Sequence, residues 1–247
     1  MEKAVKRYAP IFVLPTFLAF VIGFILPFIE GLYLSFCQFT TVKDAKFIGI
    51  GNYQRIFTDS TFTNSFKFTV LFAVASIVLI NVIAFILALL LTRKLKGTNI
   101  FRTIFFMPNL IGGIVLGYIW QILINCVLSI VGKPLLALNT SAGYWGLIIL
   151  MCWQQIGYMM IIYVAGFTSV SHDLLEAASI DGCTAFQTTR YVTLPLMVPS
   201  FVICLFLSIQ RCFMVYDVNL SLTGGGPYGT TILSAMHVYQ KTFVSKE

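Results

Sequence analysis

The sequence predicts an all-α, polytopic membrane protein with about five transmembrane helices. Apolar residues make up 58% of the 247 residues, charged residues only 10%, and the mean hydropathy is +0.90. A soluble domain carries about 25% charged residues, so this chain has too few to cover a soluble surface. Apolar blocks of about twenty residues, enough to cross a hydrocarbon core of about 30 Å, alternate with polar loops.

The first expected span covers residues 8–28 and follows Lys3, Lys6 and Arg7. A signal peptide has the same basic opening, but its apolar region is shorter and a small-residue cleavage site follows it. Here the segment Pro27-Phe28-Ile29-Glu30 follows instead. We therefore expect a retained membrane helix with a cytoplasmic N-terminus.

The second expected span, residues 66–91, ends in the basic segment Arg93-Lys94-Leu95-Lys96-Gly97. The positive-inside rule keeps such a segment cytoplasmic. The third expected span, residues 104–124, contains Pro108, which predicts a local kink. It is also rich in small residues, which let membrane helices approach closely. These are Gly112, Gly113 and Gly117.

The fourth and fifth expected spans, residues 143–168 and 195–216, flank a polar segment at residues 170–195. An external connection at residues 125–142 precedes the fourth span. Counting from a cytoplasmic N-terminus places both the basic segment after the second span and the segment 170–195 in the cytoplasm. The two placements agree.

The polar segment predicts two short helices joined by a turn. Asp173 can cap the first helix while Glu176 returns a bond to the cap. Asp181-Gly182 stops this helix, because glycine takes a positive φ without steric cost. A second helix is expected from Cys183 to about Tyr191, and Pro195 suits the first turn of the next helix. The missing N–H of that proline costs nothing at this position.

This segment resembles the EAA loop of permease subunits of binding-protein-dependent ABC importers. That pattern runs EAA, two residues, DGA, and later LP. The matching residues are Glu176, Ala177, Ala178, Asp181, Gly182, Leu194 and Pro195. Cys183 replaces the usual Ala, and Thr189 replaces the usual Phe, which removes an apolar anchor. The resemblance implies that this loop, Cys183 included, is a coupling helix that docks in a cleft of a cytoplasmic ATPase.

Two further segments resemble carbohydrate permeases. Residues 47–53, FIGIGNY, are similar to the "GLxNY" region, and residues 222–227, LTGGGP, are similar to an external loop. The glycine run lacks the GK[ST] ending of a phosphate-binding loop. Family members continue into one more membrane helix beyond a segment like residues 237–243, so we expect a family-typical last helix to be missing. The resemblance implies the type I ABC importer permease fold over a single membrane-embedded domain, residues 1–247.

The resemblance also implies the partners and the location. They are a second homologous permease in a heterodimer, two ABC ATPase subunits, an extracellular solute-binding protein, a sugar substrate and membrane lipid. ATP and Mg²⁺ would be bound by the ATPase, with no cofactor in this chain. The protein would lie in the bacterial cytoplasmic membrane. The net charge of +7 does not indicate nucleic acid, because the basic residues are scattered at the ends of apolar blocks.

The sequence contains no pattern typical of an enzyme or a metal site. It has no Walker A motif, no HExxH and no convincing nucleophile with a base. The six cysteines form no CxxC pair and are expected to be small buried residues, and the two histidines are too few for a zinc site. Energy for transport must then come from another polypeptide.

A sugar path needs hydroxyl-bonding side chains and aromatic faces. The main candidates are Tyr118, Gln121, Trp153, Gln154, Tyr158, Ser208 and Arg211. Others are Trp120, Asn125, Gln155 and Gln210. Gln154 and Tyr158 are four residues apart and share a helix face. For each candidate the alternative is an interhelical hydrogen bond or an interfacial aromatic belt.

Other functions remain open at this point. The same architecture could carry a non-sugar solute such as glycerol phosphate or a polyamine. A secondary transporter would need intramembrane charges and an internal repeat, and the spans are nearly free of charge. ATP dependence of uptake separates the importer from a secondary transporter.

Overall fold

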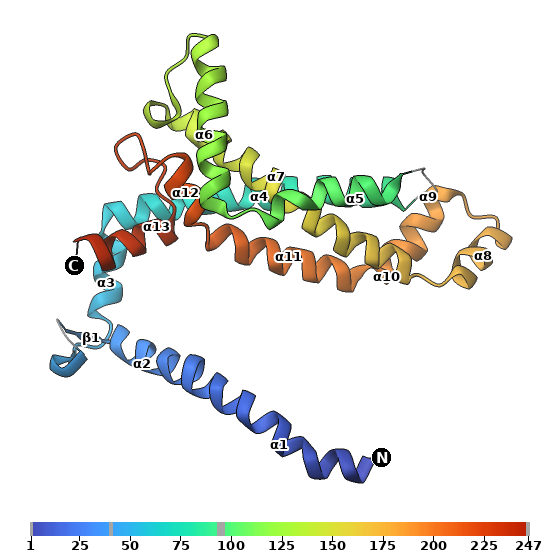
Figure 1. The fold of residues 1–247 in the computed structure, drawn as a ribbon, viewed down its shortest axis with the longest axis horizontal. Coiled ribbons are helices and arrows are strands. Elements are labelled where there is room, and N and C mark those ends of the chain that lie inside the picture. The colour runs from blue at the N-terminus through green and yellow to red at the C-terminus, as the bar shows by residue number, and fades with distance from the viewer. Residues whose placement is uncertain (1, 40–41, 93–96, 246–247) are drawn as a thin grey trace. The chain divides into compact units, whose positions relative to one another are not determined.

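The computed structural model describes residues 2–39, 42–92 and 97–245 (Figure 1). The expected basic segment at residues 93–96 lies outside the described residues, as do the side chains of Lys3, Lys6 and Arg7. The contacts divide the chain into two compact units, residues 1–63 and 64–247.

The first unit begins with a long apolar helix. Its elements are α1 (Glu2–Phe20), a π-helical turn (Val21–Ile25), α2 (Leu26–Ser35), β1 (Cys37–Gln38), a 3-10 turn (Val42–Asp44), β2 (Lys46–Phe47) and α3 (Gly51–Thr58). Residues Ile11–Ser35 are long and apolar enough to cross a membrane, so this helix continues past the expected end at residue 28. The strands β1 and β2 form a short antiparallel pair.

The GIGNY segment folds back onto the end of α2. Gly49 turns the chain with φ +64°. The Asn52 Nδ2 then donates to the carbonyl oxygens of Ser35 at 3.0 Å and Cys37 at 2.8 Å. The Tyr53 hydroxyl lies 2.8 Å from the Ser35 Oγ. This segment therefore satisfies the Ser35 carbonyl, which the end of α2 leaves without a helical partner, and the carbonyl of Cys37 in β1.

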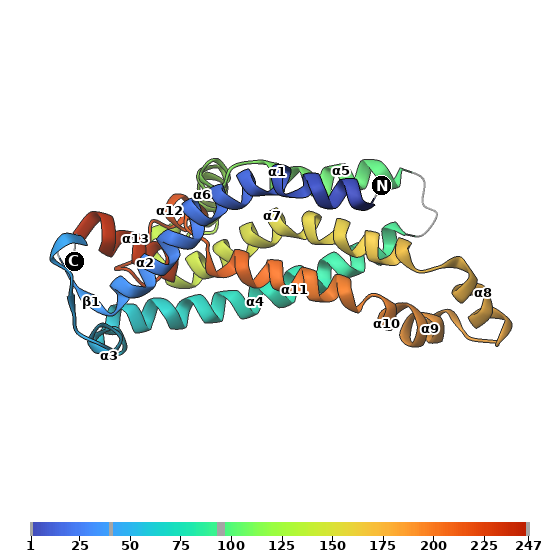
Figure 2. The ribbon, with the colours of Figure 1, turned by 90° about the horizontal axis from the view of Figure 1, so that it is seen from below.

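The second unit is a helical bundle. Its elements are α4 (Ser60–Leu91, which starts in the first unit), α5 (Thr98–Phe106), a 3-10 turn (Met107–Leu110), α6 (Gly113–Ile130), a 3-10 turn (Leu136–Leu138), α7 (Thr140–Ser169), α8 (His172–Ile180), α9 (Ala185–Thr188), a π-helical turn (Thr189–Thr193), α10 (Leu194–Leu196), α11 (Val198–Phe213), α12 (Asp217–Leu222), α13 (Ser234–Tyr239) and a π-helical turn (Gln240–Ser245). Helices α4, α7 and α11 run side by side, with α8 and α9 at one end and α12 and α13 at the other (Figures 1 and 2).

The described residues contain four helices that are long and apolar enough to span a membrane. A fifth is possible if the pair Ala185–Leu196 and Val198–Phe213, bent by 65°, counts as one span. The all-α polytopic class is therefore confirmed. The fifth expected span differs in detail, because its straight part begins at Val198 rather than at residue 195.

The third expected span is not one helix. Helix α5 ends at Phe106, and α6 begins only at Gly113. Pro108 lies in the 3-10 turn between them, and Ile111 and Gly112 are extended, with ψ 134° and 138°. Proline cannot supply the N–H of a helical turn, and here the chain does not recover the helix after it. The expected kink is thus a complete break.

The expected close packing of the third span is confirmed at two glycines. A Cβ on Gly113 would meet the Asp217 Cβ at 3.0 Å, and one on Gly117 would meet the Ser221 Cβ at 2.8 Å. Because these positions lack a side chain, α6 packs directly on α12.

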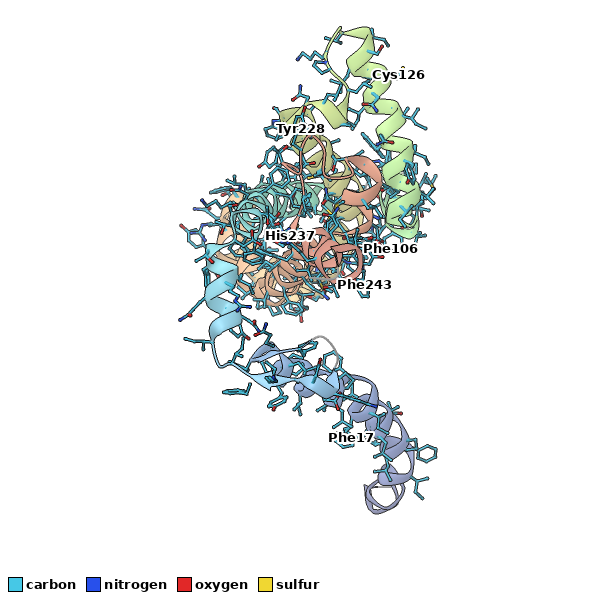
Figure 3. The ribbon with its side chains drawn as sticks, turned by 90° about the vertical axis from the view of Figure 1, so that its left-hand side faces the viewer. Phe17, Phe106, Cys126, Tyr228, His237 and Phe243 are labelled. Atoms are coloured by element: carbon cyan, nitrogen blue, oxygen red, sulfur yellow. The ribbon has the colours of Figure 1, made fainter. Side chains whose placement is uncertain are left out.

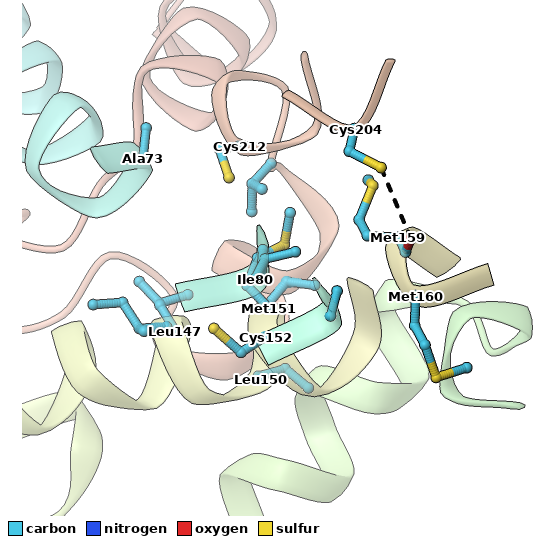
Figure 4. Close-up of a cluster of buried hydrophobic side chains, with 14 of the residues drawn as sticks. Ala73, Ile80, Leu147, Leu150, Met151, Cys152, Met159, Met160, Cys204 and Cys212 are labelled. Carbon is cyan, nitrogen blue, oxygen red and sulfur yellow. Dashed lines mark hydrogen bonds between the residues drawn. The ribbon is translucent and has the colours of Figure 1, made fainter. Parts of the chain in front are cut away.

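The buried core is rich in sulfur (Figure 4). Met151, Cys152 and Met159 on α7 and Cys204 on α11 are buried, and the Cys204 thiol contacts the Met159 carbonyl oxygen at 3.8 Å. Four of the six cysteines are buried as expected, and all six are free. The expectation is wrong for two of them, since Cys126 and Cys183 are exposed.

Candidate functional site

The first helix of the polar segment begins earlier than predicted. Helix α8 has Ser171 as its N-cap, and the Ser171 side chain makes no capping hydrogen bond. Asp173 lies inside the first turn of the helix. The predicted capping by Asp173 is therefore wrong. Glu176 instead pairs with His172, its Oε1 lying 3.1 Å from the His172 Nδ1, and both side chains are exposed. Asp173 still interacts favourably with the positive end of the helix dipole.

The predicted stop at Asp181-Gly182 is confirmed. Gly182 has φ +77°. Its N–H donates to the Ser179 carbonyl at 3.1 Å, and the Cys183 N–H donates to the Ala178 carbonyl at 3.0 Å. These two bonds form a Schellman motif, the usual way to end a helix with a glycine in the left-handed region.

The second helix begins two residues later than expected. Thr184 caps α9, and its backbone N–H donates to the Gln187 Oε1 at 2.8 Å, completing a capping box. The π-helical turn and α10 follow without a gap, and Pro195 lies in the first turn of α10 as expected. The chain then bends at Met197, between α10 and α11.

The predicted coupling residues are presented mostly to solvent. Glu176, Ala177, Asp181, Gly182, Cys183 and Pro195 are exposed, Leu194 is half-buried, and Ala178 is buried. Larger apolar side chains of the same segment are also exposed: Ile180 at 86%, Phe186 at 77% and Tyr191 at 71%. A cavity of about 560 Å³ lies between this segment and the ends of α4 and α7. Cys183 and Thr189 both line it.

A second cavity, of about 650 Å³, lies among α7, α11, α12 and the break between α5 and α6. Its polar lining residues are Asn109, Gln154, Gln155, Tyr158, Gln210, Arg211, Tyr216 and Asp217. Three of the main path candidates, Gln154, Tyr158 and Arg211, therefore come together here. Amides, phenols, one cation and one carboxylate are groups that bind hydroxyl-rich ligands.

Gln155 is an unusual member of this cavity. Its side chain is only 3% exposed, and its Oε1 has no hydrogen-bond partner in the described part of the chain. An unpaired buried acceptor costs about 1–3 kcal/mol. The Oε1 is closed to solvent in this structure, so the Gln155 side chain would have to turn toward the cavity for a ligand donor to recover this cost.

The other four main path candidates lie elsewhere. Tyr118 is exposed on α6. The Gln121 Nε2 donates to the Leu222 carbonyl at 3.0 Å and so ties α6 to α12. Trp153 packs against Trp120, with ring centroids 5.4 Å apart. Tyr118 is therefore exposed, Gln121 and Trp153 contact other helices, and none of the three lines the cavity.

Ser208 belongs to a polar network inside the bundle. Asn81 of α4 donates through Nδ2 to the Ser208 Oγ at 3.0 Å and accepts from the Tyr163 hydroxyl at 2.8 Å. Tyr163 and Ser208 are each 1% exposed. One amide thus connects α4, α7 and α11. Asn81 was not among the predicted polar candidates, although an amide within an apolar span is itself a signal of interhelical hydrogen bonding.

The bundle of apolar helices, a polar cavity and a structured loop at one end define a polytopic transport subunit. Residues 96–245 match the family model described as "Binding-protein-dependent transport system inner membrane component". The chain belongs to this family of multi-pass inner-membrane permeases, as the EAA resemblance indicated.

Similar proteins include several named sugar permeases. The chain is 41% identical to the probable starch degradation products transport system permease protein AmyD of Thermoanaerobacterium thermosulfurigenes, over 96% of this chain and 84% of the relative. It is 31% identical to the trehalose/maltose transport system permease protein MalF of Thermococcus litoralis, over 89% of this chain and 78% of that protein.

A solved structure confirms the fold. It is the crystal structure of a bacterial ABC transporter involved in the import of the acidic polysaccharide alginate. The match has a TM-score of 0.81 at 22% identity and covers 99% of this chain and 88% of the solved one. The type I ABC importer permease fold is therefore confirmed.

Proposed function

We propose that this chain is the transmembrane subunit of an ATP-driven importer that moves a sugar or oligosaccharide by alternating access. The observation that carries the proposal is a direct connection between the cavity and the segment 170–195. Helix α7 carries Gln154 and Tyr158 and runs into that segment, and α11, which carries Arg211, begins where it ends. A movement of the segment would therefore move two walls of the cavity.

The exposed apolar residues of the segment support docking to another protein. Ile180, Phe186 and Tyr191 are each exposed large side chains, and exposed apolar surface of this kind is typical of interfaces. In this proposal the partner is an ABC ATPase, which binds ATP and Mg²⁺. Two ATPases, a second homologous permease in a heterodimer and an extracytoplasmic solute-binding protein complete the assembly. The N-terminus and the segment 170–195 would then be cytoplasmic.

A saccharide is favoured as cargo over a charged solute. The relatives named above are sugar permeases, and the cavity combines Arg211 with Asp217 rather than carrying one sign of charge. One relative is an sn-glycerol-3-phosphate permease, UgpA of Agrobacterium fabrum, at 29% identity over 83% of its length. Arg211 and Asp217 together leave the cavity lining without the excess positive charge that a phosphate site uses, so we prefer a sugar as the cargo.

Photo-crosslinking tests the docking. A crosslinker at the exposed Ala185 should capture the ATPase encoded in the same operon, and Phe186→Asp should abolish the crosslink and ATP-dependent uptake while leaving the amount of folded protein unchanged. Leu138→Asp, the same change at an exposed apolar residue elsewhere, should leave the crosslink intact. Retention of the crosslink and of uptake in Phe186→Asp would contradict the proposed coupling.

The cavity yields a separate prediction. Gln155→Leu removes an unpaired acceptor and keeps the volume, so stability should not fall, but the KM for uptake of labelled maltotriose should rise about tenfold. Gln121→Leu is the matched control, since that amide bonds Leu222 and does not line the cavity. It should lower the melting temperature and leave KM unchanged. An unchanged KM in Gln155→Leu would remove this residue from the path.

A further inference from the structure

Helix α4 carries a buried hydroxyl that has no partner. Ser76 is 0% exposed, and its Oγ makes no hydrogen bond among the described residues. A hydroxyl inside a helix can donate to the carbonyl four residues earlier, and Thr69 and Ser208 in the same bundle do so, each at 2.7 Å. The Ser76 hydroxyl leaves this acceptor unused, although an unpaired buried polar group is costly. The backbone of its own helix therefore does not account for this hydroxyl.

Gln155 of α7 carries a second unpaired oxygen. It is 3% exposed, and its Oε1 has no partner in the parts of the chain that the structure describes. The described residues contain one more such atom, the Arg102 Nε of α5. That guanidinium donates through another nitrogen to the Leu91 carbonyl at 3.3 Å, at the last residue of α4. Ser76 and Gln155 are thus the two residues whose buried side-chain oxygens lack a hydrogen bond in the described ranges.

Neighbouring contacts place these two oxygens at a similar level of the bundle. The Tyr144 hydroxyl donates to the Leu71 carbonyl at 3.2 Å, and the Tyr163 hydroxyl donates to the Asn81 Oδ1 at 2.8 Å. Helices α4 and α7 are therefore parallel where they meet. Each unpaired side chain lies between these two contacts on its own helix.

The two side chains also belong to one interior. Residues three or four apart share a helix face, so Ala73 and Ile80 share the face of the serine on α4, and Met151 and Met159 share the face of the glutamine on α7. All four of these neighbours lie in one buried cluster (Figure 4). Viewed along the bundle, side chains fill the space between its helices (Figure 3). The two unpaired oxygens therefore face the same packed space between α4 and α7.

From this arrangement we infer that Ser76 is a positioning residue for Gln155, and that the two side chains form a hydrogen bond in another state of the transport cycle. In that state the serine hydroxyl donates to the Oε1 of the amide. A shift of α4 against α7 changes the distance between the two groups, and shifts of this kind are common in conformational transitions. Gln155 also lines the polar cavity. Its Oε1 therefore meets Ser76 in one orientation and a ligand in the other.

This alternative gives Ser76 a role in the release of the sugar. A ligand donor that binds the Gln155 Oε1 must compete with the Ser76 hydroxyl, so Ser76 weakens the binding of the cargo. The same hydroxyl gives the amide a partner when the sugar leaves, which avoids the cost of an unpaired buried acceptor. The inference rests on the proposed function, because it concerns the cavity through which the sugar would pass.

Binding and uptake by Ser76→Ala test the inference. The assembled importer in nanodiscs, without the solute-binding protein, is titrated with labelled maltotriose, and kcat for uptake is measured in proteoliposomes with that protein present. Ser76→Ala should lower the Kd about threefold to tenfold and should also lower kcat, because release loses its partner. In a Gln155→Leu background the same change should leave both unchanged. Ser65→Ala, at another buried serine of α4, is the matched control and should alter neither quantity.

The outcomes separate the inference from the proposed function. Ser76→Ala should fold normally, because it removes only an unpaired hydroxyl. An unchanged or raised Kd in this variant would overturn the positioning role and leave the importer assignment intact. An equal change in the Gln155→Leu background would also overturn it, because the serine would then act through packing alone. Absence of both maltotriose binding and ATP-dependent uptake in the wild type would overturn sugar import itself and, with it, the role of Ser76.

Discussion

Replacing Gly157 with valine should prevent α5 from packing on α7 and abolish folding of the bundle. A Cβ at this position would overlap the Phe105 carbonyl group and lie 2.8 Å from the Phe106 backbone nitrogen. Both obstacles are backbone atoms, so no rotamer change can relieve the clash. Overpacking of this kind costs about 3 kcal/mol or more, and the protein should lose its monodisperse peak in detergent gel filtration.

Gly31→Val is the matched control for this prediction. Gly31 lies in α2, and a Cβ there has no atom of the chain within 4 Å. This variant should keep the elution profile and melting temperature of the wild type. A Gly157→Val protein that folds as well as Gly31→Val would contradict the contact between α5 and α7.

The same contact explains why the break within the third span could not be predicted. Pro108 is compatible with either a kink or a break, and the local sequence does not choose between them. Gly157, almost fifty residues further on, lets the end of α5 approach α7, while Gly117 lets α6 approach α12. The two contacts direct α5 and α6 to different neighbours, so the two helices do not join into one. Both contacts are made with residues far away in the sequence.

Local structural features were predicted well where the conformation or hydropathy of the chain itself determines them. The stop at Asp181-Gly182 followed from the conformational freedom of glycine, and the spans followed from hydropathy. Side-chain roles within the spans were predicted less well. Gln154 and Tyr158 were correctly placed on one face, but nothing in the sequence shows which face of α11 meets α4. Ser208 was therefore assigned to the path, although its hydroxyl bonds Asn81.

Asn81→Leu should destabilise the bundle by about 1–3 kcal/mol, because it leaves the buried Tyr163 hydroxyl without its acceptor. Asn81 also donates to the Ser208 hydroxyl, so the change removes the polar connection of α4 to both α7 and α11. Hydrogen bonds between membrane helices are worth about 0.6–2 kcal/mol each. We expect a lower melting temperature in nanodiscs and a loss of ATP-dependent uptake larger than the loss of folded protein.

A double-mutant cycle separates the bond from mere packing. Tyr163→Phe removes the hydroxyl that Asn81→Leu leaves unpaired, so the double variant should be more stable than Asn81→Leu alone. Additive losses would show that the two groups do not interact. Uptake should stay low in the double variant even where stability recovers, because α4 is still disconnected from the helices that carry the cavity and border the segment 170–195. Recovery of uptake together with stability would show that the network only holds the bundle together and does not transmit movement.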